Sequence, residues 1–311
     1  MNVLKLPLAS SAVDRSGELR TDERELARLW DGARILHFAS GKFRVKSNFQ
    51  LDFQSAQEIS ELRESANFAS GQELFLGIDN GIAYFAWCSD ALVFETFEEE
   101  ENYQTLRSLG DYLSELEMGL AIHAQAIANW HHTHQFCSRC GQPTLSANGG
   151  SLRKCTSDGS EHYPRTDGAV IVLVRDSDDR VLLGRQKIWP ELRFSCFAGF
   201  VEPGESFEQT VMREVFEESG IKVEELNYLG SQPWPFPASI MISFSALATN
   251  PNEARPDGEE IVEIIWLTRG EMRSAIAENT LTLPPPMSVA RKMIEFWYEE
   301  SGADIRDLVS K

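Results

Sequence analysis

The chain has 311 residues, of which 42% are hydrophobic and 25% charged, and its formal net charge at pH 7 is −19. This length predicts two or three folded units rather than one small domain, and no apolar run approaches the roughly 20 residues that a membrane helix needs. The strong negative charge argues against a broad nucleic-acid groove, because it repels phosphate backbones.

The N-terminal part reads as mixed, strand-containing structure. A short apolar stretch, Leu4–Ala9, lacks the basic segment and the sustained hydrophobic run of a secretory signal, so we expect a cytoplasmic protein. Two strand-like segments, 73–79 and 82–87, flank Asn80-Gly81, a pair typical of a type I′ hairpin turn. Apolar residues at helical spacing then predict a helix from about Glu115 to Trp130.

Residues 137–165 predict a metal-stapled ribbon, because the segment is too small to fold on a hydrophobic core alone. Cys137, Cys140 and Cys155 lie within nineteen residues, which favours metal binding in a reducing compartment over a disulfide framework. His131, His132 and His134 precede them, and we interpret these three as the end of the helix leading into the ribbon.

The rest of the chain predicts strands around one informative helix. Segments 168–176 and 180–186 read as strands joined at Ser177–Asp179, and further strands are expected at 242–249 and 262–268. Ser206 with Gln209 suggests a capping box and Gly220 a left-handed cap, so a helix should span about 207–219. A second helix is expected at about 287–300, introduced by three prolines.

The helix at 207–219 places three carboxylates on one face, because Glu214, Glu217 and Glu218 stand at i, i+3 and i+4. Like charges at this spacing destabilise an isolated helix, and a bound cation offsets that cost. Hard divalent ions, above all Mg²⁺, suit such oxygen ligands. The alternative interpretation is a solvated acidic face.

The wider pattern runs Gly199, five residues, Glu205, seven residues, Arg213-Glu214-Val215, one residue, Glu217-Glu218, one residue, Gly220-Ile221. It resembles the Nudix box at every specified position. The resemblance implies an α/β/α sandwich that binds Mg²⁺ or Mn²⁺ for attack of water on a nucleoside diphosphate linked to another group. It further implies that the metal ligands are Glu214, Glu217, Glu218 and the carbonyl of Ala198, and that one of these glutamates can also act as the base. Arg213 would orient a carboxylate, and Glu205 would fix the loop or act from outside the metal ligands.

Downstream, three prolines alternate with Trp234 and Phe236 in residues 231–241, which predicts a rigid extended loop that presents its aromatic rings. A plain packing role is the alternative. The array SQPWPFPAS resembles the motif that marks NADH pyrophosphatases. The resemblance implies that the dinucleotide site is lined by Gln232, Pro233, Trp234, Pro235, Phe236, Pro237, Ala238 and Ser239.

The same family has a further carboxylate well after the box, and the spacing points to Glu260, unless that residue is simply an exposed charge on an edge strand. Tyr163, Phe200 and Ala290 are additional family-based candidates for substrate contact. In the ribbon, the resembling enzymes often have a fourth cysteine where this chain has Asp158. Either Asp158 or His162 completes a structural zinc site, with spacing favouring Asp158, or the ribbon has lost its metal.

These observations predict an α/β protein with three parts: an N-terminal NADH-pyrophosphatase-like domain at 1–130, a zinc-ribbon module at 131–165 and a catalytic Nudix domain at 166–311. The implied reaction is metal-dependent hydrolysis of NADH, and less well of NAD⁺, to AMP and nicotinamide mononucleotide. Removal of NAD caps from RNA and homodimerisation are also implied by the family. The competing interpretations are a Nudix hydrolase acting on ADP-ribose or dinucleoside polyphosphates, and a Nudix-derived nucleotide sensor without catalysis.

Overall fold

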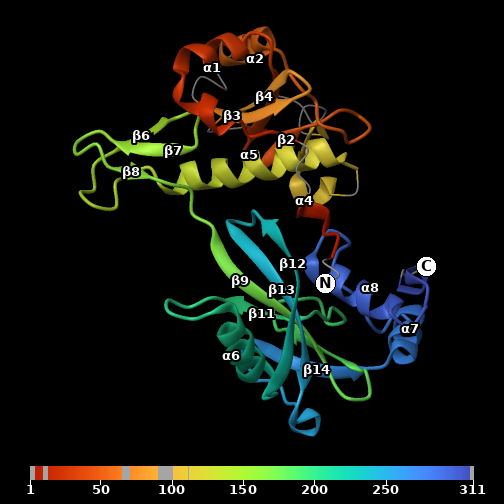
Figure 1. Cartoon of the computed structure of the whole chain (residues 1–311). Coiled ribbons are helices and arrows are strands. Elements are labelled where there is room, and N and C mark those ends of the chain that lie inside the picture. The colour runs from red at the N-terminus through yellow and green to blue at the C-terminus, as the bar shows by residue number, and fades with distance from the viewer. Residues whose placement is uncertain (1–3, 10–12, 65–70, 90–100, 111, 309–311) are drawn as a thin grey trace. The chain divides into compact units, whose positions relative to one another are not determined.

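The computed structural model describes residues 4–9, 13–64, 71–89, 101–110 and 112–308 (Figure 1). The chain forms two compact units. The C-terminal unit comprises Met1–Ala9, Asp167–Pro233 and Ser239–Lys311, and the N-terminal unit comprises Ser10–Thr166 and Trp234–Ala238. In the described part of the chain, no helix has both the length and the apolar character needed to cross a membrane.

The N-terminal unit is built on a five-stranded sheet of order β3-β4-β1-β2-β5. The predicted hairpin is confirmed: β3 and β4 pair antiparallel, and Asn80 and Gly81 between them have φ of 48° and 77°. These left-handed values are those of a type I′ turn. The strands are β1 (Arg34–Ala39), β2 (Lys42–Arg44), β3 (Gly71–Asp79), β4 (Ile82–Ser89) and β5 (Tyr103–Thr105).

The long helix of the N-terminal unit is α5 (Glu115–Thr133), as the sequence predicted, with its end three residues later. Ser114 and Glu117 form a capping box that satisfies the first backbone N–H groups. Among its described residues, the unit's other helices are η2 (Gly17–Thr21), α1 (Glu23–Trp30), α2 (Ala56–Glu64) and α4 (Leu106–Leu109).

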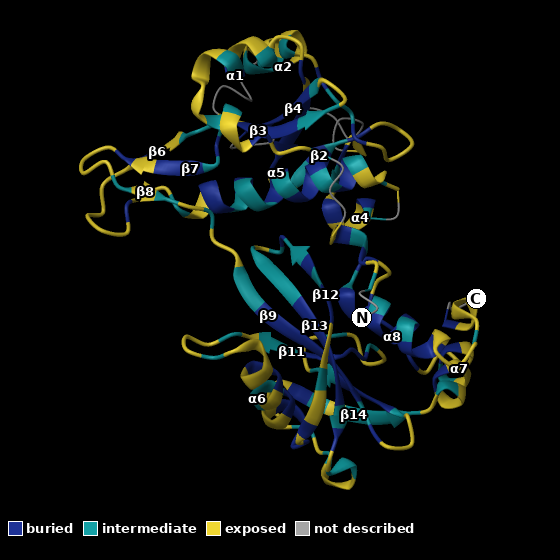
Figure 2. Cartoon of the chain, in the orientation of Figure 1, coloured by how far each residue is buried: buried dark blue, intermediate teal, exposed yellow. Residues whose placement is uncertain are grey.

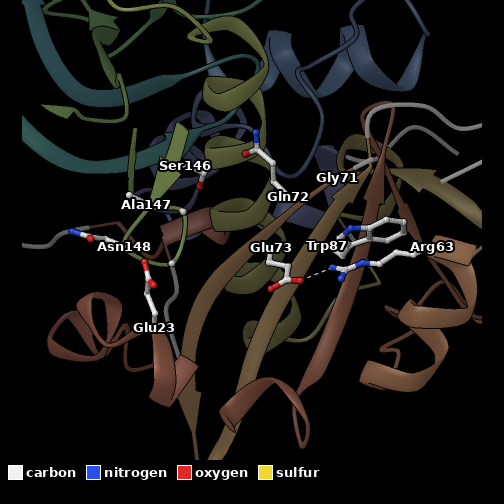
Figure 3. Close-up of a pocket in the computed structure, with 11 residues that line it drawn as sticks. Glu23, Arg63, Gly71, Gln72, Glu73, Trp87, Ser146, Ala147 and Asn148 are labelled. Carbon is white, nitrogen blue, oxygen red and sulfur yellow. Dashed lines mark hydrogen bonds and ion pairs between the residues drawn. The ribbon is translucent and has the colours of Figure 1, made fainter. Parts of the chain in front are cut away.

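The ribbon is a three-stranded sheet that packs onto β3 through a glycine turn. Its strands are β6 (Thr144–Ala147), β7 (Leu152–Cys155) and β8 (Glu161–His162). The N–H of Phe75 donates to the carbonyl of Gly149 at 2.9 Å, and a Cβ on Gly150 would lie 2.4 Å from the Leu74 side chain. Beside this turn lies a polar hollow of about 480 Å³, lined in part by the Arg63–Glu73 ion pair (Figure 3).

A buried polar group fastens the ribbon to the end of α5. Arg153 donates to the hydroxyl and the carbonyl of Thr144, both at 2.7 Å, and to Nδ1 of His131 at 2.8 Å. Because arginine only donates, the His131 proton must sit on Nε2, which donates to the carbonyl of Gly150 at 2.8 Å. Desolvation by burial lowers the pKa of His131 to about 4, so this ring is neutral. The histidine therefore has a structural role at the helix end.

The C-terminal unit is a sheet of order β12-β13-β9-β10-β14, with β11 paired to β9. Its strands are β9 (Asp167–Arg175), β10 (Val181–Gln186), β11 (Phe197–Phe200), β12 (Val223–Trp234), β13 (Ser239–Ala248) and β14 (Ile261–Leu267). The helices are η1 (Pro7–Ala9), α6 (Phe207–Ser219), η3 (Pro251–Glu253), α7 (Arg269–Ala277), α8 (Val289–Glu299) and η4 (Ile305–Leu308).

Successive apolar side chains of β9 point to opposite faces of this sheet, so the strand contributes to two cores, one on each face. Val172 belongs to the core that includes Val211 and Val215 of α6, whereas Leu173 belongs to the core that includes Ile294 and Trp297 of α8. Figures 1 and 2 show α6 and α8 on opposite sides of the largely buried β9 and β13. The predicted α/β/α sandwich is confirmed.

The N-terminal residues complete the core on the α8 side, which the sequence did not predict. Leu6 and Leu8 are 4% and 1% exposed. The N–H of Leu4 donates to the carbonyl of Leu229 at 2.7 Å, and that of Leu8 to Oε1 of Gln232 at 3.1 Å. The short apolar stretch at the start of the chain is therefore part of the C-terminal unit.

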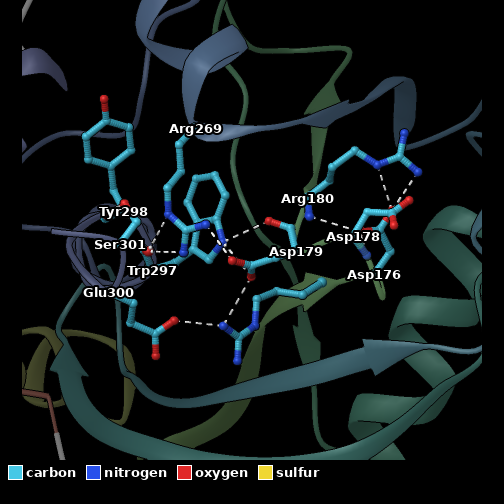
Figure 4. A network of polar contacts seen from close by, with 10 residues as sticks. Asp176, Asp178, Asp179, Arg180, Arg269, Trp297, Tyr298, Glu300 and Ser301 are labelled. Atoms are coloured by element: carbon cyan, nitrogen blue, oxygen red, sulfur yellow. Dashed lines mark hydrogen bonds and ion pairs between the residues drawn. The ribbon is translucent and has the colours of Figure 1, made fainter. Parts of the chain in front are cut away.

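The turn between β9 and β10 is held to α7 and α8 by a polar network (Figure 4). Asp179 in that turn pairs with Arg269 and accepts from the indole N–H of Trp297 at 3.2 Å. Arg269 lies over the Trp297 ring, 4.4 Å from its centroid, and Arg175 pairs with Glu300 at 2.7 Å. These contacts join the sheet to the helices that cover it.

One expectation about boundaries was wrong. The loop predicted at 231–241 is shorter, because β12 continues to Trp234 and β13 begins at Ser239. β12 ends the strand order of its sheet, where Pro233 is tolerated. The last helix, predicted at about 287–300, is confirmed: it spans Val289–Glu299, with Ser288 as its cap.

Candidate active site

The helix that carries the glutamates has both predicted ends. Ser206 accepts from the N–H of Gln209, whose side chain accepts in return from the N–H of Ser206, and Gly220 has φ of 69°. These local signals fix where α6 starts and stops, and thus which residues face the sheet.

Gly199 on β11 brings the strand against the first glutamate of the helix. A Cβ added to Gly199 would lie 1.9 to 2.2 Å from the carboxylate atoms of Glu214. Only glycine therefore lets this carboxylate rest against the strand. Burial raises the pKa of Glu214, and Arg213 opposes that shift.

Glu218 is the most deeply buried carboxylate of the site. It is 4% exposed, and its Oε2 has no hydrogen-bond partner among the described residues. Burial raises its pKa to about 8, with further contributions from the charges of Glu260 and Glu214, while a hydrogen bond from the Ala198 backbone lowers it. A buried, unpaired carboxylate oxygen beside two other carboxylates could hold a cation.

Arg213 organises the acidic residues around it. Its Nε and Nη2 donate to the two oxygens of Glu205 at 2.7 and 2.8 Å, which is a bidentate pair. Its Nη1 reaches Glu214 at 2.8 Å and Glu217 at 3.0 Å. Arg213, with the N–H of Glu202 and the hydroxyl of Thr210, lowers the pKa of Glu205 to about 2. Glu205 thus holds the loop and the arginine together.

The far carboxylate, Glu260, lies in the turn before β14. Asp257 shapes this turn by accepting from three successive backbone N–H groups, those of residues 259 to 261. The Glu260 charge raises the pKa of both Glu218 and Glu214, so the turn brings it to the carboxylates of α6. Gln186 of β10 donates to its Oε1 at 2.6 Å. Sequence reasoning did not identify Asp257 or Gln186, because neither belongs to a motif.

The proline-aromatic segment divides between the two units. Gln232 is fully buried in the C-terminal unit, where its amide accepts from the N–H of Leu8 and donates to the carbonyl of Met287 at 3.0 Å. Both polar atoms of the Gln232 side chain are thus already hydrogen-bonded to the backbone. Trp234 and Phe236 belong to the N-terminal unit, where their rings meet edge to face with centroids 4.9 Å apart.

The other candidates for substrate contact differ in exposure. Tyr163 and Phe200 are 66% and 59% exposed, in the N-terminal and C-terminal units respectively. The Tyr163 hydroxyl donates to Glu161 at 2.8 Å. Ala290 is buried in the core around α8. Of the remaining loop residues, Pro233 lies near the end of β12 and Ser239 is the first residue of β13. The connection between the two strands contains Pro235, Pro237 and Ala238.

The ribbon gathers four metal-ligand side chains. One ligand atom from each of Cys137, Cys140, Cys155 and Asp158 lies within 4.8 Å of the others, and His162 is outside this group. The two ligand pairs lie in turns with the same hydrogen bond. The N–H of Gly141 donates to the carbonyl of Cys137, and the N–H of Gly159 donates to that of Cys155. Three sulfurs and one carboxylate fit a tetrahedral zinc site.

The two remaining cysteines lie outside this cluster. Cys196 is buried, and burial raises its pKa to about 12, so the thiol is inert. Cys88 is half-buried on β4.

Comparison with known families matches three consecutive segments. Residues 32–130 match the NADH pyrophosphatase-like rudimentary NUDIX domain, residues 132–163 the NADH pyrophosphatase zinc ribbon domain and residues 164–285 the NUDIX domain.

Among curated proteins, the chain is 38% identical to the NAD-capped RNA hydrolase NudC of Mycobacterium bovis over 303 residues, 94% of this chain and 95% of that protein. The same figures hold for the protein of that name from Mycobacterium tuberculosis. Human NAD-capped RNA hydrolase NUDT12 is 36% identical over 70% of this chain and 51% of its own length. The chain therefore belongs to the NADH pyrophosphatase, or NAD-capped RNA hydrolase, family of the Nudix superfamily.

Proposed function

We propose that the chain hydrolyses the pyrophosphate bond of NADH, and less well of NAD⁺, to AMP and nicotinamide mononucleotide. The observation that carries the proposal is the buried, unpaired Oε2 of Glu218 beside Glu214 and Glu260. Four glutamates and one carbonyl offer oxygen ligands that suit Mg²⁺ or Mn²⁺: Ala198, Glu214, Glu217, Glu218 and Glu260. Bound there, such ions neutralise pyrophosphate charge and acidify the attacking water.

Residues of the Nudix box hold the carboxylates in place for this chemistry. Arg213 fixes Glu214 and Glu217 through direct hydrogen bonds, and it takes its own orientation from Glu205. Gly199 leaves room for the Glu214 carboxylate against β11. At neutral pH the raised pKa keeps a proton on Glu218, which it gives up when a cation arrives.

The nicotinamide preference is assigned to the loop at 232–239, because its rings, Trp234 and Phe236, are only partly buried and can stack on a flat substrate ring. The relatives named NAD-capped RNA hydrolases support NAD-capped RNA 5′ ends as a second substrate. The net charge of −19 suggests that the RNA body adds little to binding. Zinc bound by Cys137, Cys140, Cys155 and Asp158 would have a structural role. We further propose that the protein acts as a homodimer in the cytoplasm.

The test is product analysis after incubation with NADH, NAD⁺, ADP-ribose and NAD-capped RNA, each with Mg²⁺ or Mn²⁺. We expect AMP and reduced nicotinamide mononucleotide from NADH, and no products from a Glu218→Gln variant. ADP-ribose cleaved faster than NADH would favour the broader Nudix hydrolase. Nucleotide binding by folded protein without cleavage of any substrate would favour the sensor.

A further inference from the structure

The substrate-selecting loop is held by the N-terminal unit, although it connects two strands of the C-terminal unit. Trp234–Ala238 forms part of the N-terminal unit. The side-chain amide of Gln125 donates to the carbonyl of Pro235 at 2.8 Å. That of Asn129 donates to the carbonyls of Pro235 and Pro237 at 3.1 and 3.0 Å.

These two donors suit a proline-rich loop. Proline has no backbone N–H, so its carbonyl is the polar backbone atom through which a partner holds it. Gln125 and Asn129 stand four residues apart on α5 and therefore share one face of that helix. Gln125 is 6% exposed, so its hydrogen bond is sheltered from water.

A cation covers the ring pair of the same loop. The guanidinium carbon of Arg107 lies 3.9 Å from the centroid of Phe236 and 5.2 Å from that of Trp234. Arg107 belongs to the short helix α4, which is anchored by the fully buried Leu106 and Leu109. In the described parts of the chain, no carboxylate forms an ion pair with Arg107, and its guanidinium lies over the faces of the two rings.

A positive charge at this place has a consequence for the choice of nicotinamide. The oxidised nicotinamide ring carries a positive charge, whereas the dihydronicotinamide ring is neutral. A ring that stacks on the far face of Phe236 would lie about 7 Å from the Arg107 guanidinium, which is one stacking distance of roughly 3.5 Å beyond the 3.9 Å contact. Two unit charges at about 7 Å repel enough, even in water, to weaken binding about threefold.

We propose that Arg107 is a specificity-determining residue that makes the enzyme favour NADH over NAD⁺, and that Gln125 and Asn129 are positioning residues for the rings beneath it. This inference rests on the proposed function. It gives the N-terminal unit, which has no catalytic motif, a direct part in substrate choice. The preference arises from repulsion of the oxidised ring rather than from any contact that NADH alone can make.

The experiment measures kcat and KM of the full-length protein for NADH, NAD⁺ and ADP-ribose in the parent and in Arg107→Gln and Arg107→Lys. We expect Arg107→Gln to lower the NADH/NAD⁺ ratio of kcat/KM threefold or more. Arg107→Lys should keep most of the preference, because it keeps the charge. ADP-ribose, which has no nicotinamide, should change by less than twofold in both variants. Arg273→Gln, at an exposed site on α7, is the matched control for net charge.

Salt provides a readout that a folding defect does not reproduce. Screening by added salt should reduce the NADH/NAD⁺ ratio of the parent and leave that of Arg107→Gln unchanged. For the positioning residues, Gln125→Met and Asn129→Ala should raise KM for both nicotinamide substrates several-fold, with kcat within twofold and the ratio unaltered.

The inference is overturned if Arg107→Gln keeps the parental ratio, or if Arg107→Lys loses it to the same extent. Unchanged KM values in both α5 variants would remove the positioning role. A parent protein that cleaves none of the three substrates would instead contradict the proposed function itself, so the two failures are distinguishable.

Discussion

Replacing Glu218 with glutamine should change how the stability of the metal-free protein depends on pH. The pKa of this buried carboxyl is raised from 4.5 to about 8. The folded state therefore binds the proton more tightly than the unfolded chain does. Its stabilising contribution is complete below about pH 4.5 and is lost as the pH rises to about 8. Glutamine keeps the shape of the neutral form and cannot ionise.

The magnitude follows from the size of the shift. Each pKa unit corresponds to about 1.4 kcal/mol, and the folded group is already half deprotonated at about pH 8, so the parent should lose roughly 2 kcal/mol relative to Glu218→Gln between pH 6 and 8. For a unit of this size that is a difference of roughly 4 to 8 °C in melting temperature. The comparison of variant with parent at each pH cancels the contributions of groups that lie far from Glu218.

The assay is thermal unfolding of parent and variant at several pH values from 5.5 to 8.5, in buffer free of divalent cations apart from zinc. Glu217→Gln is the matched control, because its side chain is 56% exposed and its removal should leave the pH dependence close to that of the parent. Added Mn²⁺ should stabilise the parent more at pH 8 than at pH 6, since binding releases the proton. Parallel pH profiles for parent and Glu218→Gln would refute a buried, protonated Glu218.

Three further changes test other parts of the structure. Gly199→Ala should lower kcat by about 100-fold, because its Cβ displaces the Glu214 carboxylate, whereas Gly168→Ala, whose Cβ has ordinary contacts, should retain activity; equal activity of the two variants would contradict this. Asp158→Ala should reduce the zinc content per chain after dialysis against a chelator, and Asp158→Cys should retain it; full retention by the alanine variant would exclude Asp158 as a ligand. Arg153→Met should lower the free energy of unfolding of the N-terminal unit by roughly 3 kcal/mol in urea titrations, because buried acceptors lose their donor; an unchanged midpoint would show that this clamp is dispensable.

Local features were determined by the sequence alone. The ends of α6 follow from Ser206, Gln209 and Gly220, and the β3–β4 turn follows from Asn80-Gly81. Each signal acts within a few residues, through one hydrogen bond or one backbone angle, so it can be recognised without knowing the rest of the fold. The spacing of the box glutamates along one helix face is of the same kind.

Features that join distant parts of the chain were decided by the tertiary structure. The packing of Gly199 against Glu214, the burial of Leu6 in the C-terminal core and the contact of Arg107 with Phe236 leave no periodic pattern in the sequence. The contribution of Glu260 was inferred only through the family resemblance. Such contacts depend on how the sheets and helices pack, and neither spacing nor residue propensity encodes that arrangement.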